Sequence, residues 1–172
     1  MLKLFLLAIG GALGTLARYG LNGLVSGHQG RHFPWAVTFP LGTLVVNVTG
    51  CFVIGLVAAV SEPAMGRTWL TTNQRDFFMV GLCGGYTTFS SFGIQTLNLA
   101  RDGEWFYVAA NVIGSNALGL LAVYLGWISG QFMQTKLHGG ALRNSKATVN
   151  CSASISANKT NGIISRSKKR SS

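Results

Sequence analysis

The chain has 172 residues, of which 48% are hydrophobic and only 10% are charged, so it is more apolar than most soluble domains. Its formal charge of +10 is unevenly placed, because eight of its fourteen Lys and Arg residues lie beyond residue 133. The remaining sequence has no run of interleaved basic and aromatic residues of the kind that binds nucleic acid. Composition therefore excludes nucleic acid as a partner and predicts one small membrane domain.

Four apolar runs follow one another along the chain and predict four transmembrane helices. Each run is close to the ~20 residues that a helix needs to cross the hydrocarbon core of a bilayer. The runs cover residues 4–25, 41–60, 77–99 and 105–132. The segments between them hold all three prolines and all four carboxylates, and they are predicted to be water-exposed loops over residues 26–40, 61–76 and 100–104. We therefore expect an all-α, multi-pass membrane protein.

The last part of the chain, residues 133–172, differs in composition from the rest. It is rich in Ser, Asn, Lys and Gly and poor in large apolar side chains, so it cannot bury enough surface to offset the entropy of ordering. We expect a transmembrane domain over residues 1–132, followed by a basic, disordered tail. At the other end, Lys3 precedes the first run as in a signal peptide, but Arg18 and the three later runs favour a helix that is retained.

The four runs contain neutral hydrogen-bond donors and no carboxylate. An exporter that trades protons for a cationic drug needs an acid inside the membrane. No nucleophile has the acid and base partners of an enzyme either. Thr43 and Asn47 are four residues apart, as are Asn111 and Ser115, so each pair shares one helical face. Two interpretations of these faces stay open. They would line a polar track through the membrane, or their side chains would form hydrogen bonds with one another across helices.

The third run contains a stretch that is poor in helix formers. Gly84-Gly85 followed by Thr87-Thr88 favours a break in the helix, which would free backbone carbonyl groups for a cation. Phe89 and Phe92 follow at a spacing of three and project to one side. The positive edges of their rings can face an anion that has shed its water. Ordinary packing is the alternative reading of these two rings.

Three blocks of sequence carry a resemblance to a known family. They are Gly10-Gly11-Ala12-Leu13-Gly14 through Arg18-Tyr19, Gly42-Thr43-Leu44-Val45-Val46-Asn47, and Gly81-Leu82-Cys83-Gly84-Gly85 followed by Thr87-Thr88-Phe89-Ser90-Ser91-Phe92. Over residues 1–132 the chain resembles the Fluc/CrcB fluoride channels. The resemblance implies an antiparallel, dual-topology homodimer in lipid that passively exports fluoride across the plasma membrane and lowers its toxicity. The alternatives are a non-conducting membrane scaffold and a small cation or drug exporter.

The resemblance also implies roles for individual residues by their position in the motifs. The residues lining the fluoride path would be Thr43, Asn47, Phe89, Phe92, Tyr107 and Ser115, with Arg18 at the vestibule. A structural Na⁺ at the centre of the dimer would be held by the backbone carbonyls of Gly84 and Thr87. The chain departs from the pattern of many members at Gly93, Gln95 and Asn111. These departures bear on the polarity and rate of the pore more than on its identity.

Overall fold

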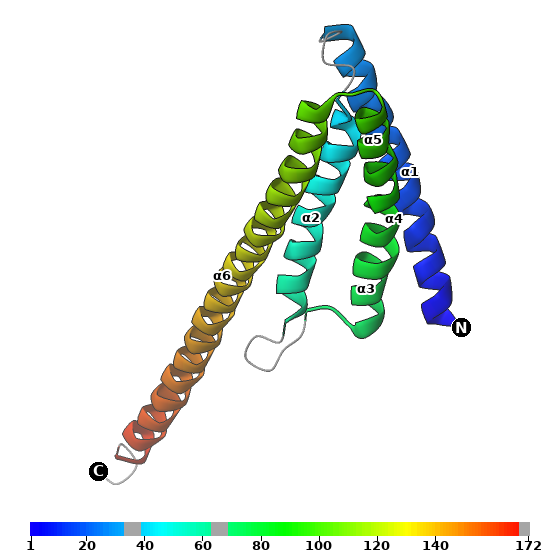
Figure 1. Cartoon of the computed structure of the whole chain (residues 1–172). Coiled ribbons are helices and arrows are strands. Elements are labelled where there is room, and N and C mark those ends of the chain that lie inside the picture. The colour runs from blue at the N-terminus through cyan, green and yellow to red at the C-terminus, as the bar shows by residue number, and fades with distance from the viewer. Residues whose placement is uncertain (33–38, 63–68, 169–172) are drawn as a thin grey trace. The chain divides into compact units, whose positions relative to one another are not determined.

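The computed structural model describes the backbone of residues 1–32, 39–62 and 69–168, and the side chains of these segments as far as residue 136 (Figure 1). The described residues form helices and short connections without any strand, which confirms the all-α prediction. By its internal contacts the chain divides into two units, Met1–Phe132 and Met133–Ser172.

Among the described residues, four helices are long and apolar enough to cross a membrane, which confirms the predicted number of spans. Their bounds are Leu2–His32, Leu41–Ser61, Thr72–Arg101 and Trp105–Lys136. The first two spans are the helices α1 (Leu2–His32) and α2 (Leu41–Ser61), and the fourth is the beginning of α6 (Trp105–Lys168). The third span consists of α3 (Thr72–Asp76), a π-helical segment (Phe77–Cys83), α4 (Gly84–Tyr86) and α5 (Phe89–Arg101).

The second unit is the C-terminal part of the chain. In the structure α6 continues as far as Lys168, so the backbone of this segment is helical where the sequence predicted an irregular tail. The sequence of residues 133–172 has too few large apolar residues to form the apolar stripe by which a helix packs onto a core. The disorder of the tail in solution stays a prediction.

The first helix is longer than predicted, because it ends at His32 and not near residue 25. Residues 26–32 are therefore helical and not part of a loop, and the rings of His28 and His32 lie 4.3 Å apart on it. A tertiary contact accounts for the extra turns, since the buried Gln29 donates its amide to the carbonyl of Phe39, at 2.9 Å. A single glycine such as Gly30 costs a helix only about 1 kcal/mol, which such a contact can offset.

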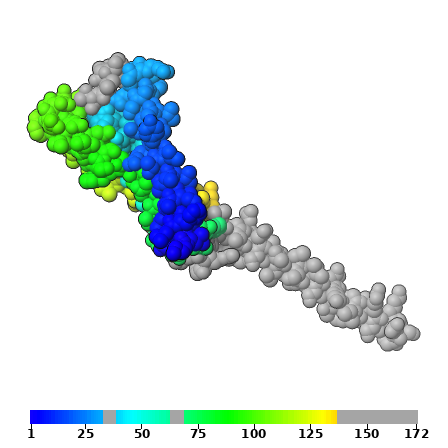
Figure 2. Space-filling view, turned by 90° about the vertical axis from the view of Figure 1, so that its right-hand side faces the viewer, coloured from blue at the N-terminus to red at the C-terminus, as the bar shows by residue number. Residues whose placement is uncertain are grey.

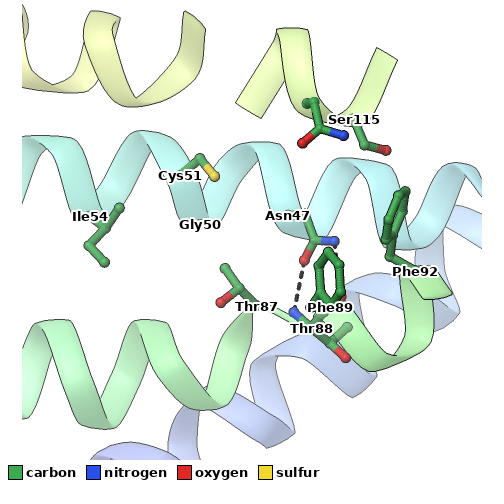
Figure 3. Close-up of a pocket in the computed structure, with 10 residues that line it drawn as sticks. Asn47, Gly50, Cys51, Ile54, Thr87, Thr88, Phe89, Phe92 and Ser115 are labelled. Carbon is green, nitrogen blue, oxygen red and sulfur yellow. Dashed lines mark hydrogen bonds between the residues drawn. The ribbon is translucent and has the colours of Figure 1, made fainter. Parts of the chain in front are cut away.

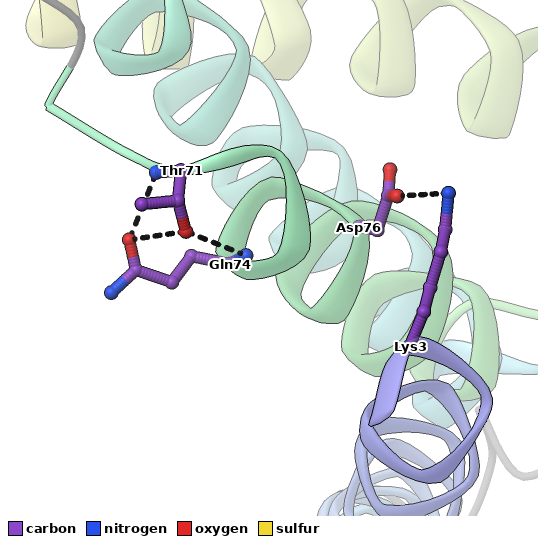
Figure 4. Close-up of polar contacts among 4 residues, drawn as sticks. All are labelled: Lys3, Thr71, Gln74 and Asp76. Atoms are coloured by element: carbon purple, nitrogen blue, oxygen red, sulfur yellow. Dashed lines mark hydrogen bonds and ion pairs between the residues drawn. The ribbon is translucent and has the colours of Figure 1, made fainter. Parts of the chain in front are cut away.

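The third span also begins earlier than predicted, at Thr72 and not near residue 77. Thr71 and Gln74 form a capping box, in which the backbone N–H of each residue donates to the side chain of the other, at 2.9 and 3.4 Å (Figure 4). The added turn contains Asp76, which was predicted to lie in a loop. Its carboxylate pairs with Lys3 at the start of α1, at 2.7 Å (Figure 4).

Glycines bring α1 directly against the third span. A Cβ atom on Gly10 would lie 2.9 Å from the carbonyl oxygen of Phe77, and one on Gly85 would lie 2.5 Å from that of Gly11. Figure 2 shows α1, in blue, running along one face of the first unit with part of the third span, in green, beside it. In lipid, such small residues let two backbones approach closely enough for dispersion to hold them together. Tight packing therefore explains these glycines.

The second and fourth spans pack in the same way and are joined by a polar contact at one end. A Cβ atom on Gly126 would lie 3.0 Å from the backbone nitrogen of Leu56. Glu62, just after α2, accepts hydrogen bonds from the indole N–H of Trp127 at 3.4 Å and from the amide of Gln131 at 2.8 Å. This contact ties the end of α2 to α6.

Candidate functional site

The third span breaks at Thr87 and Thr88, which separate α4 from α5. Thr87 has a ψ of 154°, and Thr88 has φ and ψ of −148° and 112°, so both are extended. The sequence predicted a break in this region, and for the two threonines that prediction is confirmed. The glycines before them are still helical, since Gly84 has φ and ψ of −64° and −37° and Gly85 lies in α4. Gly85 is needed instead for the close approach to Gly11.

Asn47 on α2 pairs with the backbone at the break (Figure 3). Its side-chain amide donates to the carbonyl oxygen of Thr88 at 3.1 Å, and its side-chain oxygen accepts from the N–H of Thr88 at 2.8 Å. The backbone N–H and carbonyl of Thr88, which has left the helix, are thereby both hydrogen-bonded. An amide NH₂ group has two hydrogens, so one donor of Asn47 remains for another partner.

Other backbone groups at the break differ in how they are satisfied. Thr88 caps α5, because its hydroxyl accepts from the N–H of Ser91 at 3.2 Å. The N–H and the hydroxyl of Thr87 both donate to the carbonyl of Cys83, each at 2.9 Å. Within the described part of the chain, the carbonyl oxygens of Gly84 and Thr87 receive no hydrogen bond from the loop backbone or from a side chain.

A cavity of about 290 Å³ opens at the break, between α2, the third span and α6 (Figure 3). Its lining residues are Asn47, Gly50, Cys51, Ile54, Thr87, Thr88, Phe89, Phe92, Ser115 and Asn116. Four of the predicted path residues, Asn47, Phe89, Phe92 and Ser115, are thus brought together. The rings of Phe89 and Phe92 lie 5.4 Å apart on the same side of α5, as their spacing predicted. Amides, hydroxyls and two rings share this wall with Gly50, Cys51 and Ile54, and none of the residues lining it carries a charge.

A second cavity of about 180 Å³ holds two more of the predicted residues. Arg18 and Thr43 line it, together with Thr15, Tyr19, Asn22, Val46, Thr88 and Ser91. Thr43 is buried and Arg18 is half-buried. Thr88 contributes to both cavities, so the break lies between them.

Tyr107 lines neither of these two cavities. Its ring lies 6.1 Å from that of Phe39 and 5.7 Å from that of Phe106. Its place in a fluoride path stays a prediction.

Thr96 is a residue of this region that the sequence did not single out. Its hydroxyl donates to the carbonyl of Phe92 and accepts from the side-chain amide of Asn111, each at 2.8 Å. Asn111 is only 2% exposed and accepts from Ser115 at 3.4 Å, as their spacing suggested. A signal for Thr96 was present, since a threonine four residues after Phe92 can bond back to its carbonyl. Its partner on α6 could not be read from spacing.

Comparison with known proteins identifies the family. The model of a family described as CrcB-like protein, Camphor Resistance (CrcB) matches residues 5–127, a range that contains the broken span and both cavities. The chain belongs to the CrcB family. This result confirms the resemblance seen in the sequence.

Relatives in the CrcB family match most of the chain. A protein from Opitutus terrae is 51% identical over 123 residues, which are 72% of this chain and 88% of that protein. One from Rhodospirillum rubrum is 50% identical over 121 residues, 70% and 88% of the two chains. One from Methylobacterium radiotolerans is 44% identical over 144 residues, 84% and 92% of the two chains. Each of the three is named fluoride-specific ion channel FluC. With its four spans, this CrcB chain is a multi-pass membrane protein.

Proposed function

We propose that this chain is the subunit of a passive, fluoride-selective channel in the plasma membrane, through which fluoride leaves the cell so that its toxicity falls. The observation that carries the proposal is the cavity at the break, where amide and hydroxyl groups and two phenyl rings converge without a carboxylate. The name shared by the relatives supports fluoride as the ion.

The chemistry of the cavity suits a small anion that must lose its water. The free donor of Asn47, the amide of Asn116 and the hydroxyl of Ser115 are neutral groups that can replace water around an anion. The edges of Phe89 and Phe92 carry partial positive charge and add a weaker attraction. No acid among the lining residues couples the ion to a proton, so the flow is passive, and the channel performs no enzyme chemistry.

Arg18 and Thr43 form the vestibule in this proposal. The guanidinium of Arg18 lies half-buried in the smaller cavity, where screening by water is reduced. It would therefore raise the local concentration of anions next to Thr88, the residue that borders both cavities.

We infer that two copies of the chain assemble as an antiparallel homodimer in lipid. Ser90 and Asn116 are exposed on the single chain although they lie in membrane spans, and Phe89, which lines the larger cavity, is 82% exposed. Polar groups that face hydrocarbon are costly, so these side chains favour a protein partner over lipid. A second copy would cover this surface and close the cavity.

A Na⁺ ion at the centre of that dimer is part of the proposal. The carbonyl oxygens of Gly84 and Thr87 fit it, because they are hard ligands left without loop or side-chain partners in the described residues. Gly84 is exposed, so a second copy can bring its own pair of carbonyls close. The ion would balance the carbonyl dipoles at the break. We expect the purified protein to unfold at a higher temperature in Na⁺ than in N-methylglucamine, and equal midpoints would contradict the site.

A flux assay tests the function and separates it from the alternatives. Liposomes bearing the purified protein are loaded with fluoride or chloride, and release is followed with ion-selective electrodes against protein-free liposomes. We expect release of fluoride and not of chloride. No release of either ion would favour a scaffold, comparable release of both would exclude selectivity, and proton-driven uptake of an organic cation would indicate an exporter.

A further inference from the structure

Three hydrogen bonds in sequence connect the wall of the larger cavity to a buried contact between α5 and α6. Ser115 lines the cavity and donates to Asn111, which donates to Thr96, which donates to the backbone carbonyl of Phe92. Thr96 and Asn111 do not line the cavity themselves. They lie behind it, and Asn111 is 2% exposed.

The donor and acceptor inventory fixes the direction of these bonds. The hydroxyl of Thr96 has one hydrogen, which it gives to the carbonyl of Phe92, so it presents only lone pairs to α6. The side chain of Asn111 must therefore direct its NH₂ group toward Thr96. Because an amide is planar, its oxygen then points the other way, toward Ser115. Thr96 thus determines which end of Asn111 meets the cavity wall.

The contact between Asn111 and Ser115 is the weakest of the three. Its length of 3.4 Å lies near the limit of a hydrogen bond, whereas the other two measure 2.8 Å. An anion in the cavity can therefore compete with Asn111 for the hydrogen of the Ser115 hydroxyl. When no anion is present, the amide oxygen of Asn111 accepts that hydrogen and fixes the direction of the hydroxyl. If Asn111 turned its NH₂ group toward Ser115, the serine oxygen would accept a hydrogen bond from that group. The Ser115 hydroxyl would then lose the acceptor that fixes its direction at the cavity wall.

We infer that Thr96 and Asn111 are positioning residues, which hold the Ser115 hydroxyl ready to donate to the transported anion. The inference rests on the proposed function, because it assigns these residues to the same cavity. It predicts that they affect fluoride flow only through Ser115.

The test compares Thr96→Val with Thr96→Ser in the liposome assay. Valine keeps the shape of threonine but removes the hydroxyl, so the buried NH₂ group of Asn111 loses its acceptor and turns elsewhere. We expect Thr96→Val to lower fluoride flux about tenfold, and Thr96→Ser, which restores the hydroxyl, to stay close to wild type. Asn111→Leu breaks the same connection from the other helix and should lower flux similarly.

A double-mutant cycle distinguishes positioning from a general effect on packing. If Thr96 acts through Ser115, Thr96→Val added to Ser115→Ala should lower flux no further than Ser115→Ala alone. Thr49→Val is the matched control, since it removes another threonine hydroxyl that bonds across helices, to Tyr86 at 2.8 Å, and should leave flux unchanged. The inference is overturned if Thr96→Val conducts like wild type, or if it lowers flux by the same factor with and without Ser115. A wild-type protein that conducts no fluoride would overturn the proposed function itself.

Discussion

Asn47 on α2 and Thr88 in the third span form two hydrogen bonds with each other, one in each direction. The pair resembles two residues of adjacent strands, with a side-chain amide in place of one backbone. Without it, the N–H and carbonyl of Thr88 would lie unpaired inside a membrane span, at a cost of several kcal/mol. The residue proposed to face the anion therefore also stabilises the break that creates the cavity.

This double role makes Asn47→Asp a strong test. The substitution replaces the donor to Thr88 with an oxygen and introduces a negative charge into a cavity whose lining residues are uncharged. We expect fluoride flux in liposomes to fall about a hundredfold or more. Asn73→Asp is the matched control, because Asn73 is exposed near the start of the third span and outside the cavity. Equal flux in the two variants would show that charge at position 47 is not sensed by the ion.

A second prediction concerns the ring of Phe89. Phe89→Ile keeps an apolar side chain but removes the positively polarised edge that lines the cavity beside Phe92. We expect flux to fall at least about tenfold while the dimer remains intact by size-exclusion chromatography. Phe5→Ile makes the same change on an exposed phenylalanine of α1 and should have no effect on flux. Wild-type flux in Phe89→Ile would contradict the prediction and show that the ring of Phe89 serves only packing.

The contact between α1 and the third span gives a third prediction, on stability. In Gly85→Ala the new Cβ would lie 2.5 Å from the backbone oxygen of Gly11, so the two helices must separate. We expect a loss of about 1–3 kcal/mol in the free energy of unfolding in detergent. Gly20→Ala is the control, because a Cβ there meets nothing within 4 Å and alanine is the better helix former. A Gly85→Ala protein as stable as Gly20→Ala would disprove the close contact.

The order of the spans could be predicted because it depends on local properties of the sequence. Each apolar run is close to or above the length of a membrane crossing, and the break could be placed because two adjacent threonines follow a glycine pair. The ends of the helices were less predictable. The extension of α1 to His32 depends on Gln29 bonding to Phe39, and the early start of the third span depends on the capping box of Thr71.

The site was predictable where neighbours in sequence form it and not where distant residues meet. Phe89 and Phe92 share a cavity, as a spacing of three suggests. The pairing of Asn47 with the backbone of Thr88, 41 residues away, is a tertiary contact that no spacing encodes. The separation of Thr43 from the larger cavity arises because Thr88 lies between the two cavities.

The distribution of positive charge leads to the last prediction, on orientation in the membrane. With four spans, both termini are expected on one side, together with Lys3 and Arg75; Arg67, which the sequence assigns to the same side, lies outside the described residues. The opposite side carries Arg31 and Arg101. Arg18 lies within α1, so it contributes less than a residue at a helix end.

Orientation follows the bias of Lys and Arg near the ends of the spans, and this core offers almost none. The tail changes the balance, because Lys136, Arg143 and Lys146 follow the fourth span closely and favour a cytoplasmic C-terminus. We therefore expect a chain that ends at Phe132 to insert in both orientations at similar levels, and the full chain to be biased toward a cytoplasmic C-terminus and to form fewer antiparallel dimers. Two C-terminal reporters, one active only in the cytoplasm and one only outside, measure the two populations.

Changing the three basic residues to glutamine in the full chain should restore the balance if charge, and not the length of the tail, is the cause. A shortened chain that activates a single reporter would disprove the dual topology.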